Sequence, residues 1–324
     1  MPRNAANAVF LVFDACTAWP MNLTWLDDFL ALAASGNFSR AAEERHMTQP
    51  AFSRRIRALE EWLAVDLFDR SSQPVRLTET GQWFRKVAQD LLADVARIPG
   101  EARAIAEAHS TTLRFAATHA LSFTFMPDWL RSLEAHTSMG PIRLLSDVQQ
   151  TCEALLLQSQ VQFVLSHAHE LAPGPLQAGG YPSVRVGSDE LIPVSAPDEA
   201  GAPAHRLDIK GKVASVQLLG YSTESGLARI LKQVRGTVME RLHTHTVFTA
   251  HLASVLRTMA LSGRGVAWLP ATLIREDLAS GRLVAAAPED WRIALDIRLY
   301  RDRAAVGAAG EDFWTAVKQK DAAP

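Results

Sequence analysis

The sequence predicts an α/β protein in three parts: a small, mostly helical winged helix-turn-helix unit, a linker helix and a two-lobed α/β domain. Three observations lead to this prediction. Short amphipathic helices and a hairpin follow one another over residues 21–78, one long helix covers residues 79–108, and strands alternate with helices over residues 109–324. Residues 1–20 show no helical period, so we expect either that Met21 is the natural start or that these residues form a flexible leader.

The helix-turn-helix prediction rests on apolar spacing. Leu23, Leu26, Leu30 and Ala33 recur at intervals of three and four residues, and Gly36 is expected to end this first helix. We expect Ser39 to cap a second helix over residues 39–45. A third helix begins at Thr48-Gln49-Pro50, where a first-turn proline loses no hydrogen bond. Its inward face is predicted to be Phe52, Ile56, Leu59 and Leu63. Three helices with a tight turn between the last two are typical of a helix-turn-helix.

The hairpin and the linker helix follow directly. Two short alternating runs, residues 65–70 and 75–77, flank a polar turn and predict a small wing. Thr78 is expected to cap the long helix, whose apolar stripe includes Trp83, Val87, Leu91 and Val95. Because the linker has no core of its own, we expect a partner helix to cover this stripe, and hence a dimer.

The C-terminal stretch is predicted to be α/β because strand and helix patterns alternate along it. Its first unit has a strand at residues 113–117 and a helix at about residues 123–135. Repeated units of this kind are typical of parallel sheets, and the length of the stretch favours two lobes. It contains no nucleophile elbow, Walker loop or His-Glu-x-x-His motif. We therefore predict that the protein is not an enzyme, with an α/β enzyme fused to a DNA-binding module as the remote alternative.

Overall composition is that of a globular protein without a broad positive field. Of 324 residues, 48% are hydrophobic and 21% charged, and the formal net charge is −2. Any contact with DNA must therefore come from a local concentration of positive charge. The two cysteines, Cys16 and Cys152, are too few for a disulfide framework, and the apolar run at residues 9–13 is too short to cross a membrane. We expect a cytoplasmic protein with no membrane partner.

The third helix carries that local charge. Gln49, Ser53, Arg54 and Arg57 are expected to point away from the core, and Arg54, Arg55 and Arg57 lie within four residues. Gln can bond adenine edges, Arg can fork onto guanine, and Ser can reach a base or a phosphate. An arginine cluster alone is more often a solvated helix face. Its position directly after a tight helical turn favours a recognition helix.

Residues 21–98 resemble the N-terminal region of LysR-type transcriptional regulators. Five blocks in the same order carry the resemblance: residues 26–33, 36–42, 48–60, 67–70 and 77–81. The resemblance implies binding to double-stranded promoter or operator DNA. Besides a regulator and an enzyme, a third interpretation is a scaffold protein whose helix-turn-helix has lost its affinity for DNA. A second basic residue near Gln73 in the wing is missing. The expected DNA-binding residues are Thr48, Gln49, Pro50, Ser53, Arg54, Arg57 and Arg70.

The resemblance extends over the rest of the chain and implies a periplasmic-binding-protein-like effector domain with two lobes, two crossovers and a ligand cleft. Two polar segments, residues 118–122 and 221–225, occupy matching positions after a strand and before a helix. Free N–H groups there bind anions or polar ligands, although an ordinary helix cap is the more common role for a serine such as Ser122 or Ser225 before a helix. The expected effector-binding residues are Thr118, His119, Ser122, His167, Ser222, Thr223 and Trp268.

The signal itself stays open between a small-molecule effector and an oxidant. Residues 48–60 and 116–122 are most similar to the hypochlorite-responsive LysR-type subgroup, in which methionine oxidation is implicated. The matching positions here are Leu133, Leu227 and Leu252, so that mechanism does not carry over. Candidates for an independent Met or Cys redox switch of oxidative-stress genes are Met126, Met239, Met259 and Cys152, for which burial in the core is the simpler interpretation.

Neither a cofactor nor a metal is predicted. The two His-x-His pairs, His167/His169 and His243/His245, lack a third ligand nearby in the sequence.

The implied assembly is a dimer, or a dimer of dimers, that places recognition helices in successive major grooves. An effector would change the angle between the lobes, and with it DNA bending and the access of RNA polymerase. Activation and repression are both compatible with this arrangement.

Overall fold

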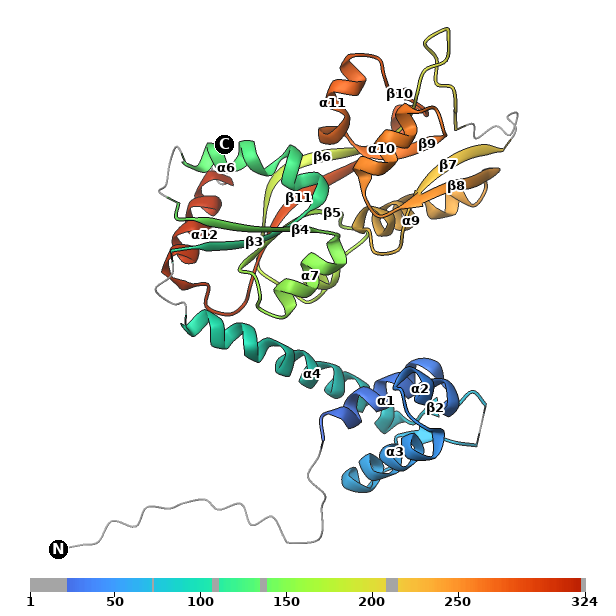
Figure 1. Cartoon of the computed structure of the whole chain (residues 1–324), viewed down its shortest axis with the longest axis vertical. Helices are drawn as coiled ribbons and strands as arrows, with labels where there is room; N and C mark the ends of the chain where they lie inside the picture. The colour runs from blue at the N-terminus through green and yellow to red at the C-terminus, as the bar shows by residue number, and fades with distance from the viewer. Residues whose placement is uncertain (1–21, 72, 107–110, 135–138, 208–214, 322–324) are drawn as a thin grey trace, which may run out of the picture. The chain divides into compact units, whose positions relative to one another are not determined.

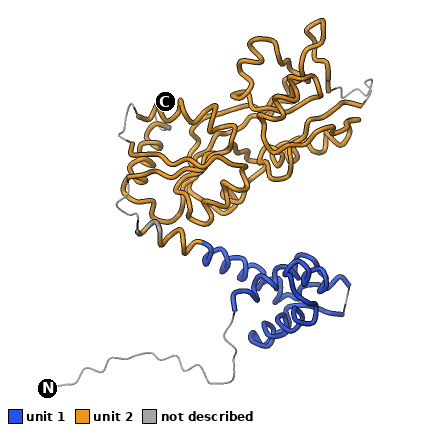
Figure 2. The backbone as a smooth tube through the Cα atoms, viewed as in Figure 1, with its two compact units in different colours: residues 1–96 blue, residues 97–324 orange. Residues whose placement is uncertain are grey.

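The computed structural model describes residues 22–71, 73–106, 111–134, 139–207 and 215–321. The predicted leader, residues 1–20, lies outside the described residues. The chain divides into two compact units, residues 1–96 and 97–324, which we describe separately (Figure 2). In the described part of the chain, no helix is both long and apolar enough to span a bilayer.

The first unit contains the predicted helices and wing. Its elements are α1 (Thr24–Ser35), α2 (Phe38–Glu44), α3 (Gln49–Leu63), β1 (Phe68–Asp69), β2 (Arg76–Leu77) and the start of α4 (Glu79–Ala106). Gly36 ends α1 in the left-handed conformation, at φ 61°. The predicted cap of α2 is wrong by two residues, because the Asn37 side chain accepts hydrogen bonds from the N–H groups of Ser39 and Arg40. Thr78 caps α4 as predicted, since its hydroxyl accepts from Gly81 N at 3.0 Å.

The core of this unit joins the three helices to the wing and to α4. Phe52, Ile56 and Leu59 of α3 are fully buried, as predicted. Phe29 lies at the centre, with its ring 5.2 Å from that of Phe68 in β1 and 5.0 Å from that of Phe84 in α4. The wing and the start of α4 are therefore fixed against the helix-turn-helix.

The second unit alternates strands and helices, as predicted. Its strands are β3 (Leu113–Thr118), β4 (Ile142–Asp147), β5 (Phe163–Ala168), β6 (Ser183–Ser195), β7 (Val216–Tyr221), β8 (Thr244–Ala250), β9 (Val266–Pro270), β10 (Val284–Ala285) and β11 (Ile293–Arg301). Its helices are α5 (His119–Thr124), α6 (Met126–Glu134), α7 (Gln149–Leu157), α8 (Pro175–Ala178), α9 (Gly226–Met239), α10 (Ala253–Leu261), α11 (Ala271–Ala279), the 3-10 turn η1 (Glu289–Trp291) and α12 (Gly307–Asp321).

Two lobes share the sheet of this unit (Figure 1). The strand order is β4-β3-β5-β11-β6-β9-β7-β8, with β10 paired to β6. Lobe 1 contains β3, β4, β5, α5 to α8 and α12, and lobe 2 contains β7 to β10 and α9 to α11. Each lobe has its own hydrophobic core, centred on Phe115 and Phe163 in lobe 1 and on Ile230 and Leu256 in lobe 2. The predicted two lobes are thus confirmed.

The long strands β6 and β11 run from one lobe into the other. They pair antiparallel with each other, from Ile293 opposite Leu191 to Tyr300 opposite Ser183. The prediction of purely parallel sheets is therefore wrong for these two strands, although β3, β4 and β5 are mutually parallel, as are β7, β8 and β9. The strands β6 and β11 form the two crossovers that the family resemblance implies. A chain that crosses twice between lobes must reverse its direction, so its crossing strands oppose their neighbours.

Candidate DNA-binding surface and inter-lobe cleft

A tight turn positions α3, the helix that the sequence predicts to read DNA. His46 is left-handed, at φ 54°, and Met47 N donates to Ala42 O at 2.9 Å. Thr48 is extended and forms the N-cap, and Pro50 lies in the first turn of the helix. The four side chains expected to face outward behave as follows: Gln49, Arg54 and Arg57 are exposed, and Ser53 is half-buried. Thr48 and Pro50 are exposed beside them.

The arginine cluster of α3 is divided between two tasks. Asp28 of α1 is fully buried and accepts from Arg45 Nε at 2.8 Å and from Arg55 Nη1 at 3.1 Å. Arg55 is therefore committed to holding α1, α2 and α3 together. With the described residues, Arg54 and Arg57 form no ion pair, so their guanidinium groups are free for a ligand. No local pattern in the sequence predicts this role of Asp28, because its partners lie 17 and 27 residues away.

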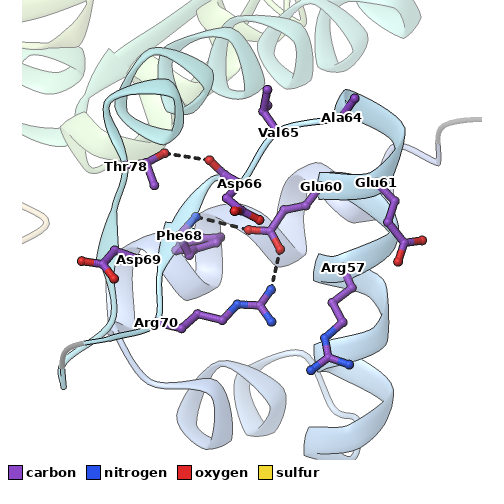
Figure 3. Close-up of a pocket in the computed structure, with 10 residues that line it drawn as sticks. All are labelled: Arg57, Glu60, Glu61, Ala64, Val65, Asp66, Phe68, Asp69, Arg70 and Thr78. Carbon is purple, nitrogen blue, oxygen red and sulfur yellow. Dashed lines mark hydrogen bonds and ion pairs between the residues drawn. The ribbon is translucent and has the colours of Figure 1, made fainter.

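Arg70, at the base of the wing, has a buried acidic partner. Glu60 of α3 accepts from the N–H groups of Leu67 and Phe68 at 3.0 and 3.2 Å, and its other oxygen pairs with Arg70. The Arg70 guanidinium also lies 5.6 Å from the centre of the Phe38 ring. Figure 3 shows it directed toward Glu60, whereas Arg57 points away from that carboxylate. Arg70 thus fixes the wing to the recognition helix and still keeps part of its surface in solvent.

An open groove of about 750 Å³ separates α3 from the wing (Figure 3). Its lining includes Glu61, Asp66 and Asp69 as well as the two arginines described above. The Ser71 hydroxyl and N–H both donate to Asp69, and these hydrogen bonds hold the pKa of that carboxyl below its usual value. The acidic lining does not suit a phosphate inside the groove, so we place any phosphate contact on its outer, arginine-bearing edge.

In the second unit, a small cleft lies where the strand ends of the two lobes meet. It has a volume of about 40 Å³ and takes residues from β3, β4 and β5 of lobe 1 and from the starts of α9 and α10 in lobe 2. Of the predicted effector-binding residues, Thr118, His119 and His167 line it. Residues absent from that prediction also line it, namely Asp147, Gln149, Ser225, Gly226, His251 and Leu252 among others.

The other four predicted residues lie elsewhere. Ser122 is buried and bonds His119 O at 2.9 Å and the Ser146 hydroxyl at 2.8 Å. Trp268 is buried in the core of lobe 2, with its ring 6.4 Å from that of Trp291. Thr223 is exposed and Ser222 half-buried, and neither lines the cleft. Matching positions in the two lobes predicted the end of each lobe at which the cleft lies, but side-chain packing decides which residues line it.

Contacts between the lobes close the cleft. The Gln149 side chain of α7 lies directly on Gly226 of α9, where a Cβ atom would stand 1.5 Å from Gln149 Oε1. Gln149 Nε2 donates to Glu153 Oε1 at 2.8 Å, and Arg229 Nη2 of α9 donates to the same oxygen at 3.3 Å. We call Gln149, Glu153 and Arg229 the latch. Because its members come from both lobes, the latch opposes their separation.

A second, buried contact ties the lobes at the crossover strand β6. Asp189 Oδ2 lies 3.0 Å from His167 Nε2 of lobe 1, and Thr272 of lobe 2 donates to Asp189 through its N–H at 3.1 Å and its hydroxyl at 2.6 Å. Burial by itself raises the pKa of Asp189, but the hydrogen bonds from His167 and Thr272 outweigh it and hold that pKa below its usual value. We call Asp189, His167 and Thr272 the hinge pin.

The sulfur groups that a redox switch would need are poorly placed. Cys152 is buried, as predicted, and burial raises the pKa of its thiol to about 12. Met126 is buried in the core of lobe 1, and Met239 and Met259 are half-buried against the core of lobe 2. Within the described ranges, no three His, Cys, Asp or Glu residues are grouped so that they could hold a metal ion.

A winged helix-turn-helix joined to a two-lobed α/β domain with a cleft between its lobes defines a DNA-binding regulator with an effector-binding domain. Residues 23–82 match the family model of the bacterial regulatory helix-turn-helix protein, lysR family, and residues 106–322 match the LysR substrate binding domain. The chain therefore belongs to the LysR family of transcriptional regulators, and it is not an enzyme.

Individual relatives agree with this assignment along nearly the whole chain. The HTH-type transcriptional regulator YjiE of Escherichia coli (strain K12) is 30% identical over 309 residues, which cover 94% of this chain and 98% of that protein. The full-length structure of HypT, a hypochlorite-specific LysR-type regulator of Salmonella typhimurium, is 29% identical with a TM-score of 0.56, covering 94% and 99%. Vibrio fischeri DarR, solved in complex with DNA, is 29% identical with a TM-score of 0.53, covering 92% and 99%.

Proposed function

We propose that α3 reads operator DNA in the major groove and that the wing contacts the adjacent backbone. The exposed, unpaired side chains of Gln49, Arg54 and Arg57 on a rigidly held helix are the observation that carries this proposal. Arg70 contributes the exposed part of its guanidinium to a phosphate. The proposed interface comprises Thr48, Gln49, Pro50, Ser53, Arg54, Arg57 and Arg70.

Substitution of Arg54 tests the interface. The full-length protein first selects its operator from a random duplex library, and the affinity for that duplex is then measured by fluorescence anisotropy. We expect Arg54→Ala to weaken binding roughly ten- to a hundredfold, the range for losing one good base contact. Arg131→Ala, which removes an exposed arginine from α6 of the second unit, is the matched control and should leave affinity unchanged. Equal affinities for the two variants would refute the assignment of α3.

We further propose that α4 pairs with α4 of a second copy. Trp83, Val87, Leu91, Ile98 and Ile105 lie along this helix, and Trp83 and Ile105 are 62% and 78% exposed. Their spacing of four or seven residues places them along one side of the helix, and a paired helix would remove that apolar surface from water. Sedimentation velocity on the full chain distinguishes a dimer from a dimer of dimers.

The division of labour along the chain follows from these assignments. We propose a leader at residues 1–20, a DNA-binding unit at 21–78, a dimerisation helix at 79–108 and an effector-binding domain at 109–324. The proposed target of the protein is promoter DNA, so we place the protein in the cytoplasm. There it would control the access of RNA polymerase to the promoter.

For the signal, we propose a small polar effector that enters the inter-lobe cleft and releases the latch. The cleft already combines Thr118, His119 and His167 with the helix starts of lobe 2. Burial of Cys152 and Met126 argues against an oxidant that acts on sulfur. The test is a thermal-shift screen of the full chain against small organic acids, aromatic compounds, divalent metals and hypochlorite. A shift seen only after hypochlorite, and lost on Met126→Leu or Cys152→Ala, would replace the effector proposal with a redox switch.

A further inference from the structure

A second hollow, larger than the cleft and sharing no lining residue with it, lies between α6 and α12 of lobe 1 and α11 of lobe 2. Its volume is about 400 Å³, which is in the range of sites for small organic ligands. The inter-lobe cleft, at about 40 Å³, is an order of magnitude smaller. We call this second hollow the α6–α12 groove.

One wall of the groove is flat and aromatic. The rings of Phe125 and Trp129 are stacked with centroids 6.1 Å apart and planes 21° from parallel. Trp129 is held from behind by Phe313, whose ring meets it edge-on at 6.0 Å. Gly187 leaves room for the Phe125 ring, because a Cβ atom at position 187 would lie 2.7 Å from that ring. The wall is therefore fixed before any ligand arrives, as a platform for a flat apolar group.

The rim of the groove is positively charged. Arg275 of α11 is exposed and forms no hydrogen bond or ion pair with any described residue. Lys320, near the end of α12, donates to the Ser132 hydroxyl and adds a second cation. Asp128 is the single acidic residue among those that line the groove, and it is 3.6 Å from Arg131. The lining thus has an excess of positive charge beside an apolar wall.

We propose that the α6–α12 groove is a second ligand site, which binds a small aromatic carboxylate. The ring of the ligand packs against Phe125, which the buried Trp129 supports, and its carboxylate pairs with Arg275 and Lys320. Arg275 belongs to lobe 2 and the other three residues to lobe 1, so the ligand bridges the lobes. Its occupancy is therefore coupled to the angle between them, and through that angle to the cleft.

Calorimetric titration of the full-length protein tests this site with benzoate and 2-naphthoate. Benzamide, which has the shape of benzoate without its charge, is the ligand control. We expect both carboxylates to bind, benzamide to bind at least tenfold more weakly, and Arg275→Gln or Lys320→Gln to weaken carboxylate binding at least tenfold. Arg143→Gln is the matched protein control, because Arg143 is an exposed arginine on β4 of lobe 1 that does not line the groove.

Two outcomes would overturn the proposal. The first is that neither carboxylate binds. The second is that a carboxylate binds with the same affinity to wild type and to Arg275→Gln. The variant Gly226→Ala separates this proposal from that of the inter-lobe effector: carboxylate binding that is lost in Gly226→Ala but kept in Arg275→Gln would locate the ligand in the cleft and refute the groove. Binding that depends on Arg275 and not on Gly226 supports the groove alone.

Discussion

Replacing Asp28 by Asn removes the charge that holds the helix-turn-helix together. Asp28 is fully buried and accepts one charge-assisted hydrogen bond from Arg45 and one from Arg55. Breaking a fully buried ion pair costs about 3–5 kcal/mol. The arginine side chains are 32% and 42% exposed, so water can partly replace the lost carboxylate, and we discount the cost to about 2–3 kcal/mol.

Hydrogen exchange of the full-length protein, followed by mass spectrometry, measures this loss where it occurs. A cost of about 2–3 kcal/mol corresponds to exchange roughly 30- to 150-fold faster in peptides from α1, α2 and α3. Asp27→Asn is the matched control, since Asp27 is 46% exposed and lies 3.5 Å from the same Arg45. We expect it to change exchange by less than about fivefold. If the two variants exchange alike, Asp28 does not organise the three helices and the argument fails.

Three further predictions concern the second unit and the linker. Gly226→Ala should displace the Gln149 side chain and break its hydrogen bond to Glu153, at a cost of about 1 kcal/mol. We expect roughly fivefold faster hydrogen exchange at the starts of α7 and α9. Unchanged exchange would mean that Gln149 does not secure the lobes. Leu91→Glu should raise the dimer dissociation constant at least tenfold in sedimentation, whereas Gln89→Glu on the same helix should not. Cys152, with a pKa of about 12, has a thiolate fraction of about 10⁻⁴ at pH 8, so peptide mapping should find it unmodified by iodoacetamide in the native protein and modified in urea.

Local patterns predicted the fold where each element carries its own signal. The helices of the first unit were predicted because apolar residues recur at helical spacing and glycine or proline marks their ends. α12 was not predicted, since Gly307 and Gly310 lie within its first turn and weaken the helical pattern. Gly310 is nevertheless required there, because a Cβ atom would lie 2.8 Å from the Val306 side chain.

For the candidate sites, the sequence predicted which way single side chains face but not which distant residues they contact. Outward exposure of Arg54 and Arg57 follows from the helical period, and the structure confirms it. The inward commitment of Arg55 depends on Asp28, which no pattern within α3 reveals. In the same way, Gln149 meets Gly226 across 77 residues of sequence and between two lobes. Residue type and spacing locate a strand end, but the partner on the other lobe is set by tertiary packing.

The two connections between the lobes differ in strength, and the difference indicates how the domain opens. The Glu153–Arg229 pair of the latch is 3.3 Å long and its arginine is 34% exposed, so water can replace the arginine when the pair breaks. In the hinge pin, Asp189 and His167 are buried, and Asp189 accepts from both the N–H and the hydroxyl of the half-buried Thr272. Separating Thr272 from the Asp189 side chain, which is fully buried, costs more because water cannot readily replace its two hydrogen bonds. We propose that an effector entering the cleft breaks the latch first, while the hinge pin and the antiparallel pair β6–β11 stay intact.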